Sequence, residues 1–153
     1  MFRFLLPAMI VMATQLSAQT RTSCDMTEDD SNCVRVLACM GNTGEWLNGR
    51  AFGRGEGTFA GTTSKGVTCS GDWMSRNSLG LGQADIFCDD GRTGRVFYTF
   101  QDEYTGTAIG QGAMTSGEGI RMWSGLHVLS YLRGDTGERV ALLPCVGGDI
   151  PIS

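Results

Sequence analysis

The sequence predicts an all-β fold, a small antiparallel barrel or sandwich of about eight to ten short strands fastened by disulfides. Short β-branched and aromatic runs recur between glycine turns from Gly53 to Gly125. The chain has 153 residues and six cysteines, and no window has sustained helical periodicity. Closure into a barrel would hide the edge strands, which an exported protein has reason to do.

Residues 1–18 have the pattern of a cleaved signal peptide. A positive start is followed by an apolar run from Phe4 to Met12 and by small residues up to Ala18. The run is much shorter than the roughly 20 residues that span a bilayer as a helix. We therefore expect a periplasmic or secreted protein that does not span the membrane. Its net charge of −4 argues against a nucleic acid as partner.

All six cysteines follow the expected cleavage site. An even number in an exported chain of this size indicates disulfides. A zinc site is the alternative, but the sequence has no Cys-x-x-Cys pair and only one histidine. Six cysteines allow fifteen pairings. We favour Cys24–Cys33, which closes a small loop, Cys39–Cys145, which joins the ends of the fold, and Cys69–Cys88, from the apolar faces of neighbouring strands.

Residues 19–33 form a polar, acidic N-terminal segment, which the Cys24–Cys33 disulfide would close. Several carboxylates in one loop could bind calcium, because hard cations prefer oxygen ligands. The alternative is a solvated acidic loop, since the Asp-x-Asp-x-Asp-Gly register of calcium loops is missing. The calcium ligands would be Asp25, Glu28, Asp29 and Asp30.

Residues 34–153 are expected to form a single β-domain. Val34–Cys39 is the first strand, and 40–44 is a turn. Asn48-Gly49 predicts a tight hairpin, because both residues tolerate positive φ. Further on, Ile120–Leu132 is mostly apolar, and Gly125 inside it predicts a bend rather than one long helix.

A Gly-x-Gly pattern occurs three times, and each copy is expected to open a strand–turn–strand unit. A further glycine follows each copy at the expected turn, at Gly66, Gly91 and Gly119. A phosphate-binding loop would need a helix after the glycines, and none is expected here. The copies are Gly55-Glu56-Gly57, Gly80-Leu81-Gly82 and Gly110-Gln111-Gly112.

The first copy resembles one unit of the MORN repeat. MORN hairpins carry Gly-x-Gly and a later aromatic-x-Gly-x-aromatic pattern, here approximated by Cys69, Gly71 and Trp73. The resemblance implies open hairpin arrays that contact lipid or protein, whereas six cysteines imply a compact fold. The chain also resembles small uncharacterised exported bacterial β-proteins with a Cys-x-Asp-Gly-Arg-x-Gly turn, here Cys88–Gly94. This second resemblance implies no activity.

The sequence shows no ready catalytic constellation. His127 is the only histidine, and we interpret it as an outward-facing strand residue rather than a base. The adjacent pairs Asp89/Asp90 and Asp102/Glu103 would point to opposite faces of a strand. Arg133-Gly134-Asp135 matches an adhesion tripeptide but is typical of a hairpin turn.

We therefore expect a non-enzymatic binding or structural module of the bacterial cell envelope, or an inhibitor acting through a rigid loop. It would need no cofactor and would contact a protein, glycan or lipid. The alternative is a hydrolase that acts on glycans with carboxylates brought together by the fold. The candidate ligand-binding residues are Trp46, Trp73, Trp123 and Arg95.

Overall fold

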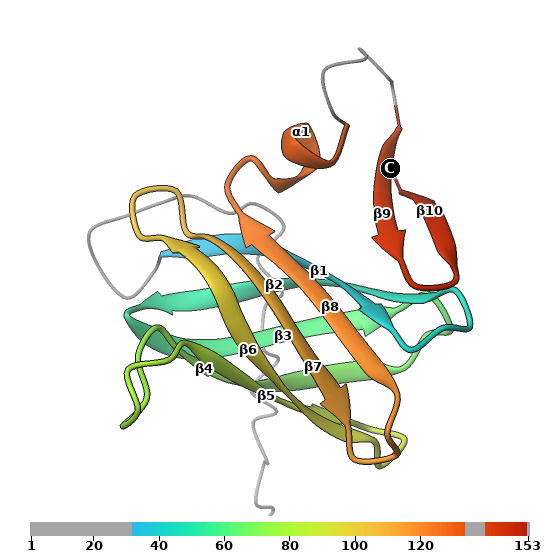
Figure 1. Ribbon diagram of the computed structural model, residues 1–153, viewed down its shortest axis with the longest axis horizontal. Coiled ribbons are helices and arrows are strands. Elements are labelled where there is room, and N and C mark those ends of the chain that lie inside the picture. The colour runs from blue at the N-terminus through green and yellow to red at the C-terminus, as the bar shows by residue number, and fades with distance from the viewer. Residues whose placement is uncertain (1–31, 134–139, 153) are drawn as a thin grey trace, which may run out of the picture.

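The computed structural model describes residues 32–133 and 140–152. Eight antiparallel strands follow one another around a closed barrel, and β1 pairs with β8 to complete it (Figure 1). The predicted all-β fold is confirmed, and the barrel is the form it takes. The barrel strands are β1 (Cys33–Met40), β2 (Glu45–Arg54), β3 (Glu56–Thr63), β4 (Thr68–Met74), β5 (Gln83–Cys88), β6 (Thr93–Asp102), β7 (Thr107–Met114) and β8 (Gly119–Gly125).

The barrel interior is filled by alternate residues of the strands, as the period-two pattern predicts. On β5, Ala84, Ile86 and Cys88 are buried, whereas Phe87 between them is exposed. The main core therefore lies inside the barrel. Its buried members are Val34, Val36, Ala38, Met40, Leu47, Ala51, Phe59, Cys69, Ala84, Ile86, Cys88, Val96, Met114, Ile120 and Met122.

A second core lies outside the barrel, against β1 and β8. A short helix, α1 (Val128–Arg133), and a hairpin of β9 (Ala141–Cys145) and β10 (Gly148–Ile152) cover this outer wall (Figure 1). The buried residues of this cluster are Leu37, Cys39, Trp123, Val128, Leu132, Ala141, Leu143, Cys145 and Ile152.

The helix α1 corrects the expectation for His127. Gly125 does end β8, as its predicted bend implies, but His127 lies in the turn before α1 and is not a strand residue. It is exposed, so its outward orientation is as expected. The helix forms because Val128 and Leu132, four residues apart, share one helical face and are both buried.

Two of the three predicted disulfides are confirmed. Cys39–Cys145 fastens the β9–β10 hairpin to the barrel, and Cys69–Cys88 joins directly opposite residues of β4 and β5. Cys33 is disulfide-bonded as well. The predicted pairing with Cys24 falls outside the described residues.

The hairpin predicted at Asn48-Gly49 is wrong. Both residues lie in the middle of β2, and the chain turns instead at Gly55, whose φ is +76°. Gly49 is needed for a close approach of strands, because a Cβ atom there would lie 2.5 Å from the carbonyl oxygen of Ala60 on β3.

The three Gly-x-Gly copies occupy different places in the barrel. Gly55 lies in a turn and Gly57 in β3, whereas Gly110 and Gly112 both lie inside β7. The turn after β7 uses Gly117, with φ +90°, and the predicted Gly119 is the first residue of β8. The first copy overlaps the start of β3 and the second directly precedes β5, but the third lies within β7 and does not open a strand.

Candidate functional site

The two ends of the barrel differ in how they are filled. At one end, side chains close the interior: Met40, Met114 and Ile120 are 2–3% exposed, and the Cys69–Cys88 disulfide lies beside them in the core. At the other end, where β2 turns into β3 and β6 into β7, the interior opens to solvent through a cavity. As far as residues 32–133 and 140–152 determine it, a molecule can enter the barrel without repacking the core at the open end alone.

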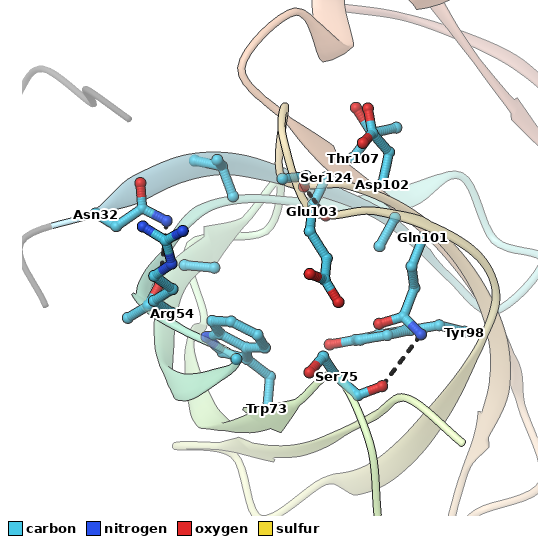
Figure 2. A pocket seen from close by; sticks show the side chains of 16 residues that line it. Asn32, Arg54, Trp73, Ser75, Tyr98, Gln101, Asp102, Glu103, Thr107 and Ser124 are labelled. Atoms are coloured by element: carbon cyan, nitrogen blue, oxygen red, sulfur yellow. Dashed lines mark hydrogen bonds between the residues drawn. The ribbon is translucent and has the colours of Figure 1, made fainter. Parts of the chain in front are cut away.

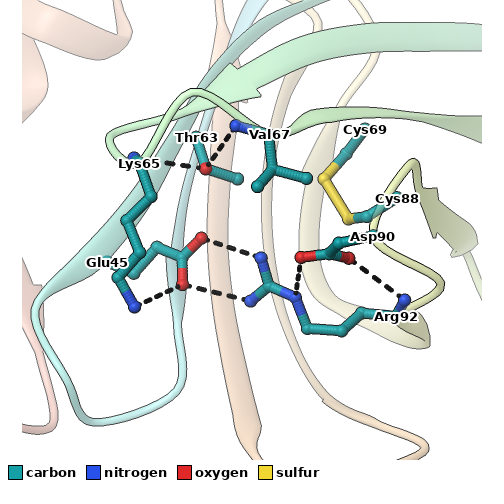
Figure 3. Close-up of a disulfide and its surroundings, with 8 residues drawn as sticks. All are labelled: Glu45, Thr63, Lys65, Val67, Cys69, Cys88, Asp90 and Arg92. Atoms are coloured by element: carbon teal, nitrogen blue, oxygen red, sulfur yellow. Dashed lines mark hydrogen bonds and ion pairs between the residues drawn. A yellow bond between two sulfur atoms is a disulfide. The ribbon is translucent and has the colours of Figure 1, made fainter.

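A buried carboxylate lies at the closed end (Figure 3). The Glu45 side chain is 3% exposed and accepts two hydrogen bonds from Arg92, at 2.8 and 3.1 Å. Lys65 lies 3.1 Å from it, and Asp90 pairs with Arg92. The hydrogen bonds from Arg92, more than those from Lys65 and Thr63, lower the pKa of Glu45 to about 2 against the opposing effect of burial. This network ties the start of β2 to the turns after β3 and β5, so we assign it a structural role.

The open end holds a cavity of about 280 Å³ (Figure 2). Its wall combines aromatic, small apolar and polar side chains from the barrel strands and the connecting loops. The lining residues are Asn32, Val34, Ala51, Gly53, Arg54, Gly55, Trp73, Ser75, Tyr98, Gln101, Asp102, Glu103, Gly106, Thr107, Ala108 and Ser124.

Two aromatic rings form the inner wall of this cavity. Trp73, near the end of β4, is fixed in place because its indole Nε1 donates a 3.0 Å hydrogen bond to the carbonyl oxygen of Phe52. Tyr98, on β6, points its hydroxyl toward the cavity (Figure 2), and burial raises its pKa. None of the described residues hydrogen-bonds to this hydroxyl, so a polar group is left available inside the site.

The loops at the open end supply a polar rim. Gln101 donates a 3.1 Å hydrogen bond from Nε2 to the carbonyl oxygen of Ser75, which ties β6 to the loop after β4. The Asp102 carboxylate turns away from the cavity and accepts hydrogen bonds from Tyr104 N, at 3.1 Å, and Thr105 Oγ1, at 2.7 Å. The Glu103 side chain, by contrast, reaches into the cavity (Figure 2).

The floor of the cavity continues into the barrel interior. A second, smaller cavity of about 40 Å³ lies beneath it and shares Ala51, Trp73, Tyr98 and Ser124 with it. The other residues around this inner space are apolar: Val36, Ala38, Met40, Leu47, Phe59, Ala84, Ile86 and Met122. The site is therefore amphipathic, with polar groups at the rim and apolar groups at depth.

Of the four predicted ligand-binding residues, only Trp73 lines the cavity. Trp46 and Trp123 belong to the outer core, where Trp123 is 4% exposed and lies under the Arg121 guanidinium, 5.5 Å from its ring centre. Arg95 is exposed on the outer face of β6 and pairs with Asp85 on β5. The fold does not bring these four residues together.

The other sequence candidates do not converge on one site either. Asp90 lies in the network at the closed end, and Asp89 is exposed in the same turn. The calcium ligands predicted at Asp25, Glu28, Asp29 and Asp30 fall outside the described residues, as does most of the Arg133-Gly134-Asp135 turn. Within residues 32–133 and 140–152, no group of three or more His, Cys, Asp or Glu residues could hold a metal ion.

Sequence reasoning missed Tyr98, Gln101 and Glu103 as members of a site. In β6 a bulge between Tyr98 and Phe100 changes which residues face inward. No local pattern marks such a bulge. Glu103 belongs to a loop, and only barrel closure places that loop beside Trp73.

The chain matches no protein-family model and no curated protein at a significant level. Among solved structures it is similar to a designed protein described as "De novo design of a fluorescence-activating beta barrel". The identity is 14% and the TM-score 0.48, over 61% of this chain and 90% of that one. The MORN resemblance stays a prediction. No helix in the described part of the chain has the length and apolarity to cross a membrane.

Proposed function

We propose that this protein is a non-enzymatic binding protein that holds one small amphipathic molecule in the open end of its barrel. The observation that carries the proposal is the cavity of about 280 Å³, with aromatic walls and a polar rim, opposite an end closed by packed side chains. Barrels of eight strands are just wide enough to be filled by side chains or to hold one small ligand.

The chemistry of the wall supports binding. Ligand sites are typically apolar and aromatic pockets with a few polar groups that fix orientation. Here Trp73 and Tyr98 supply apolar contact, and Gln101, Ser75 and Glu103 supply polar contact near the entrance. An apolar part of the ligand would enter first, leaving its polar group at the rim.

The alternative of a carboxylate-dependent hydrolase receives less support. Glycoside hydrolysis ordinarily needs two carboxyl groups facing the bond that is cleaved. At the open end Glu103 reaches into the cavity, while the Asp102 carboxylate is turned into its own loop by Tyr104 and Thr105. We therefore keep binding as the proposed function.

We further propose that the protein acts in the periplasm or outside the cell. The Cys39–Cys145 and Cys69–Cys88 disulfides are consistent with an oxidising compartment. The N-terminal pattern of residues 1–18 is that of a cleaved signal peptide. The ligand would then be a molecule of the cell envelope or of the surroundings.

Titration with the neutral, polarity-sensitive dye 1-aminoanthracene tests the proposal. The mature chain should enhance the dye's fluorescence with one saturable site. Ala51→Phe, which fills the floor of the cavity, should abolish the enhancement. Ala113→Phe, on the exposed outer face of β7, should leave it unchanged. Equal binding by all three folded proteins, or no binding by the unaltered chain, would contradict the proposal.

A further inference from the structure

We infer that the ligand of this cavity is a small organic cation, an amine or quaternary ammonium attached to a compact apolar group. The inference rests on the proposed function, because it names the ligand class of the same site. It follows from the charge at the rim, from the aromatic walls and from the size of the cavity.

The described side chains around the cavity carry a net negative charge. Among residues 32–133 and 140–152, three charged side chains line the cavity: Arg54, Asp102 and Glu103. Arg54 already takes part in an interaction of its own, and the Asp102 carboxylate accepts hydrogen bonds within its loop. Glu103 makes no hydrogen bond or ion pair with any described residue, and its carboxylate reaches into the cavity. A cation can therefore pair with Glu103 without displacing an existing partner.

The walls beside Glu103 suit a cation as well. Trp73 and Tyr98 expose ring surface to the same cavity, and a ring face attracts a cation that comes within about 6 Å of its centre. The Tyr98 oxygen points toward the cavity (Figure 2) and can also accept a hydrogen bond from an ammonium N–H, a partner that none of the described residues provides. The Glu103 carboxylate, the two aromatic rings and the Tyr98 hydroxyl therefore line the same cavity.

The dimensions limit the apolar part of the ligand. The cavity of about 280 Å³ and the space of about 40 Å³ beneath it leave room for a compact ring system or a short alkyl chain. That inner part is bounded by Ala51, Ile86 and other apolar side chains. An anion with the same skeleton would place its charge against Glu103 and be repelled.

Calorimetric titration of the intact, oxidised mature chain with three compounds of one skeleton tests the inference. These are 2-phenylethylamine, a cation, 2-phenylethanol, which is neutral, and 3-phenylpropionate, an anion. We expect the amine to bind at least tenfold more tightly than the other two, because a charged hydrogen bond adds about that factor. Glu103→Gln should weaken the amine about tenfold and leave the alcohol unchanged. Glu118→Gln, the same change at the closed end, should affect neither.

The outcomes separate this inference from the proposed function. Equal or tighter binding of the alcohol or acid overturns the cation preference, as does unchanged amine affinity in a folded Glu103→Gln protein. If Ala51→Phe still abolishes dye binding in those cases, the cavity remains the site. If all three compounds fail while the dye binds, the cation preference is also overturned. If neither the dye nor the compounds bind, the proposed function itself fails.

Discussion

Replacing Glu45 with glutamine should destabilise the protein in a pH-dependent way. The side chain is 3% exposed at the closed end of the barrel, where Arg92 donates two hydrogen bonds to it. Glutamine keeps the shape of the protonated acid and removes the charge. Arg92 keeps its ion pair with Asp90 and Lys65 is largely exposed, so the cost comes from losing the charged hydrogen bonds to Glu45.

The magnitude follows from the pKa of Glu45. The hydrogen bonds from Arg92 are the largest cause of its fall from an ordinary value of 4.5 to about 2. One pKa unit corresponds to about 1.4 kcal/mol, so the ionised form stabilises the fold by about 3 kcal/mol. A lowered carboxyl pKa contributes stability above pH 4.5, and this contribution is lost as the pH falls toward 2.

Urea unfolding followed by tryptophan fluorescence measures this effect. At pH 7 the free energy of unfolding of Glu45→Gln should be about 3 kcal/mol lower than that of the unaltered protein. The gap should narrow below pH 4.5 and close near pH 2. Glu118→Gln, an exposed change of the same kind, should stay within about 0.5 kcal/mol at every pH. A gap that is absent at pH 7, or that persists unchanged to pH 2, would refute this reasoning.

Two further predictions concern the disulfides and the strand glycines. Replacing both Cys39 and Cys145 with serine should lower the free energy of unfolding by about 5 kcal/mol, and replacing both Cys69 and Cys88 should lower it by about 3 kcal/mol. The difference arises because the first disulfide joins cysteines 106 residues apart and the second joins cysteines 19 residues apart. Equal losses in urea unfolding would contradict the loop-length argument. Gly112→Ala should cost more than 1 kcal/mol, because a Cβ atom there would overlap the carbonyl oxygen of Arg95, whereas Gly119→Ala has open space. Equal melting temperatures for these two variants would show that the strands adjust freely.

Much of the fold could be predicted from the sequence because its determinants are local. Alternation on β5 places Ile86 and Cys88 in the core. The same alternation on β4 places Cys69 on the apolar face, which identifies it as the disulfide partner of Cys88. The hairpin prediction at Asn48-Gly49 was wrong because an Asn-Gly pair permits a turn without requiring one. What requires glycine at position 49 is the carbonyl of Ala60 on the next strand, and that contact exists only after pairing.

The candidate site could be predicted only in part. Trp73 was identified from its residue type alone, as were Trp46 and Trp123, which turned out to pack in the outer core. Which tryptophan faces the cavity depends on strand register and barrel closure. The sequence identified Glu103 only as the neighbour of Asp102. The Glu103 side chain points into the cavity and the Asp102 side chain does not, and this difference is set by loop geometry, which no sequence pattern predicts.

The central claim is that the open end of the barrel is where this protein binds a small molecule. Two-dimensional ¹H–¹⁵N NMR of the mature chain during titration with 2-phenylethylamine tests it directly. We expect saturable shifts of the Trp73 indole N–H and of the amides of Ser75, Gln101 and Glu103, with the amides of Lys65 and Arg92 unmoved. Shifts confined to the closed end or to the outer face around Trp123 would contradict it.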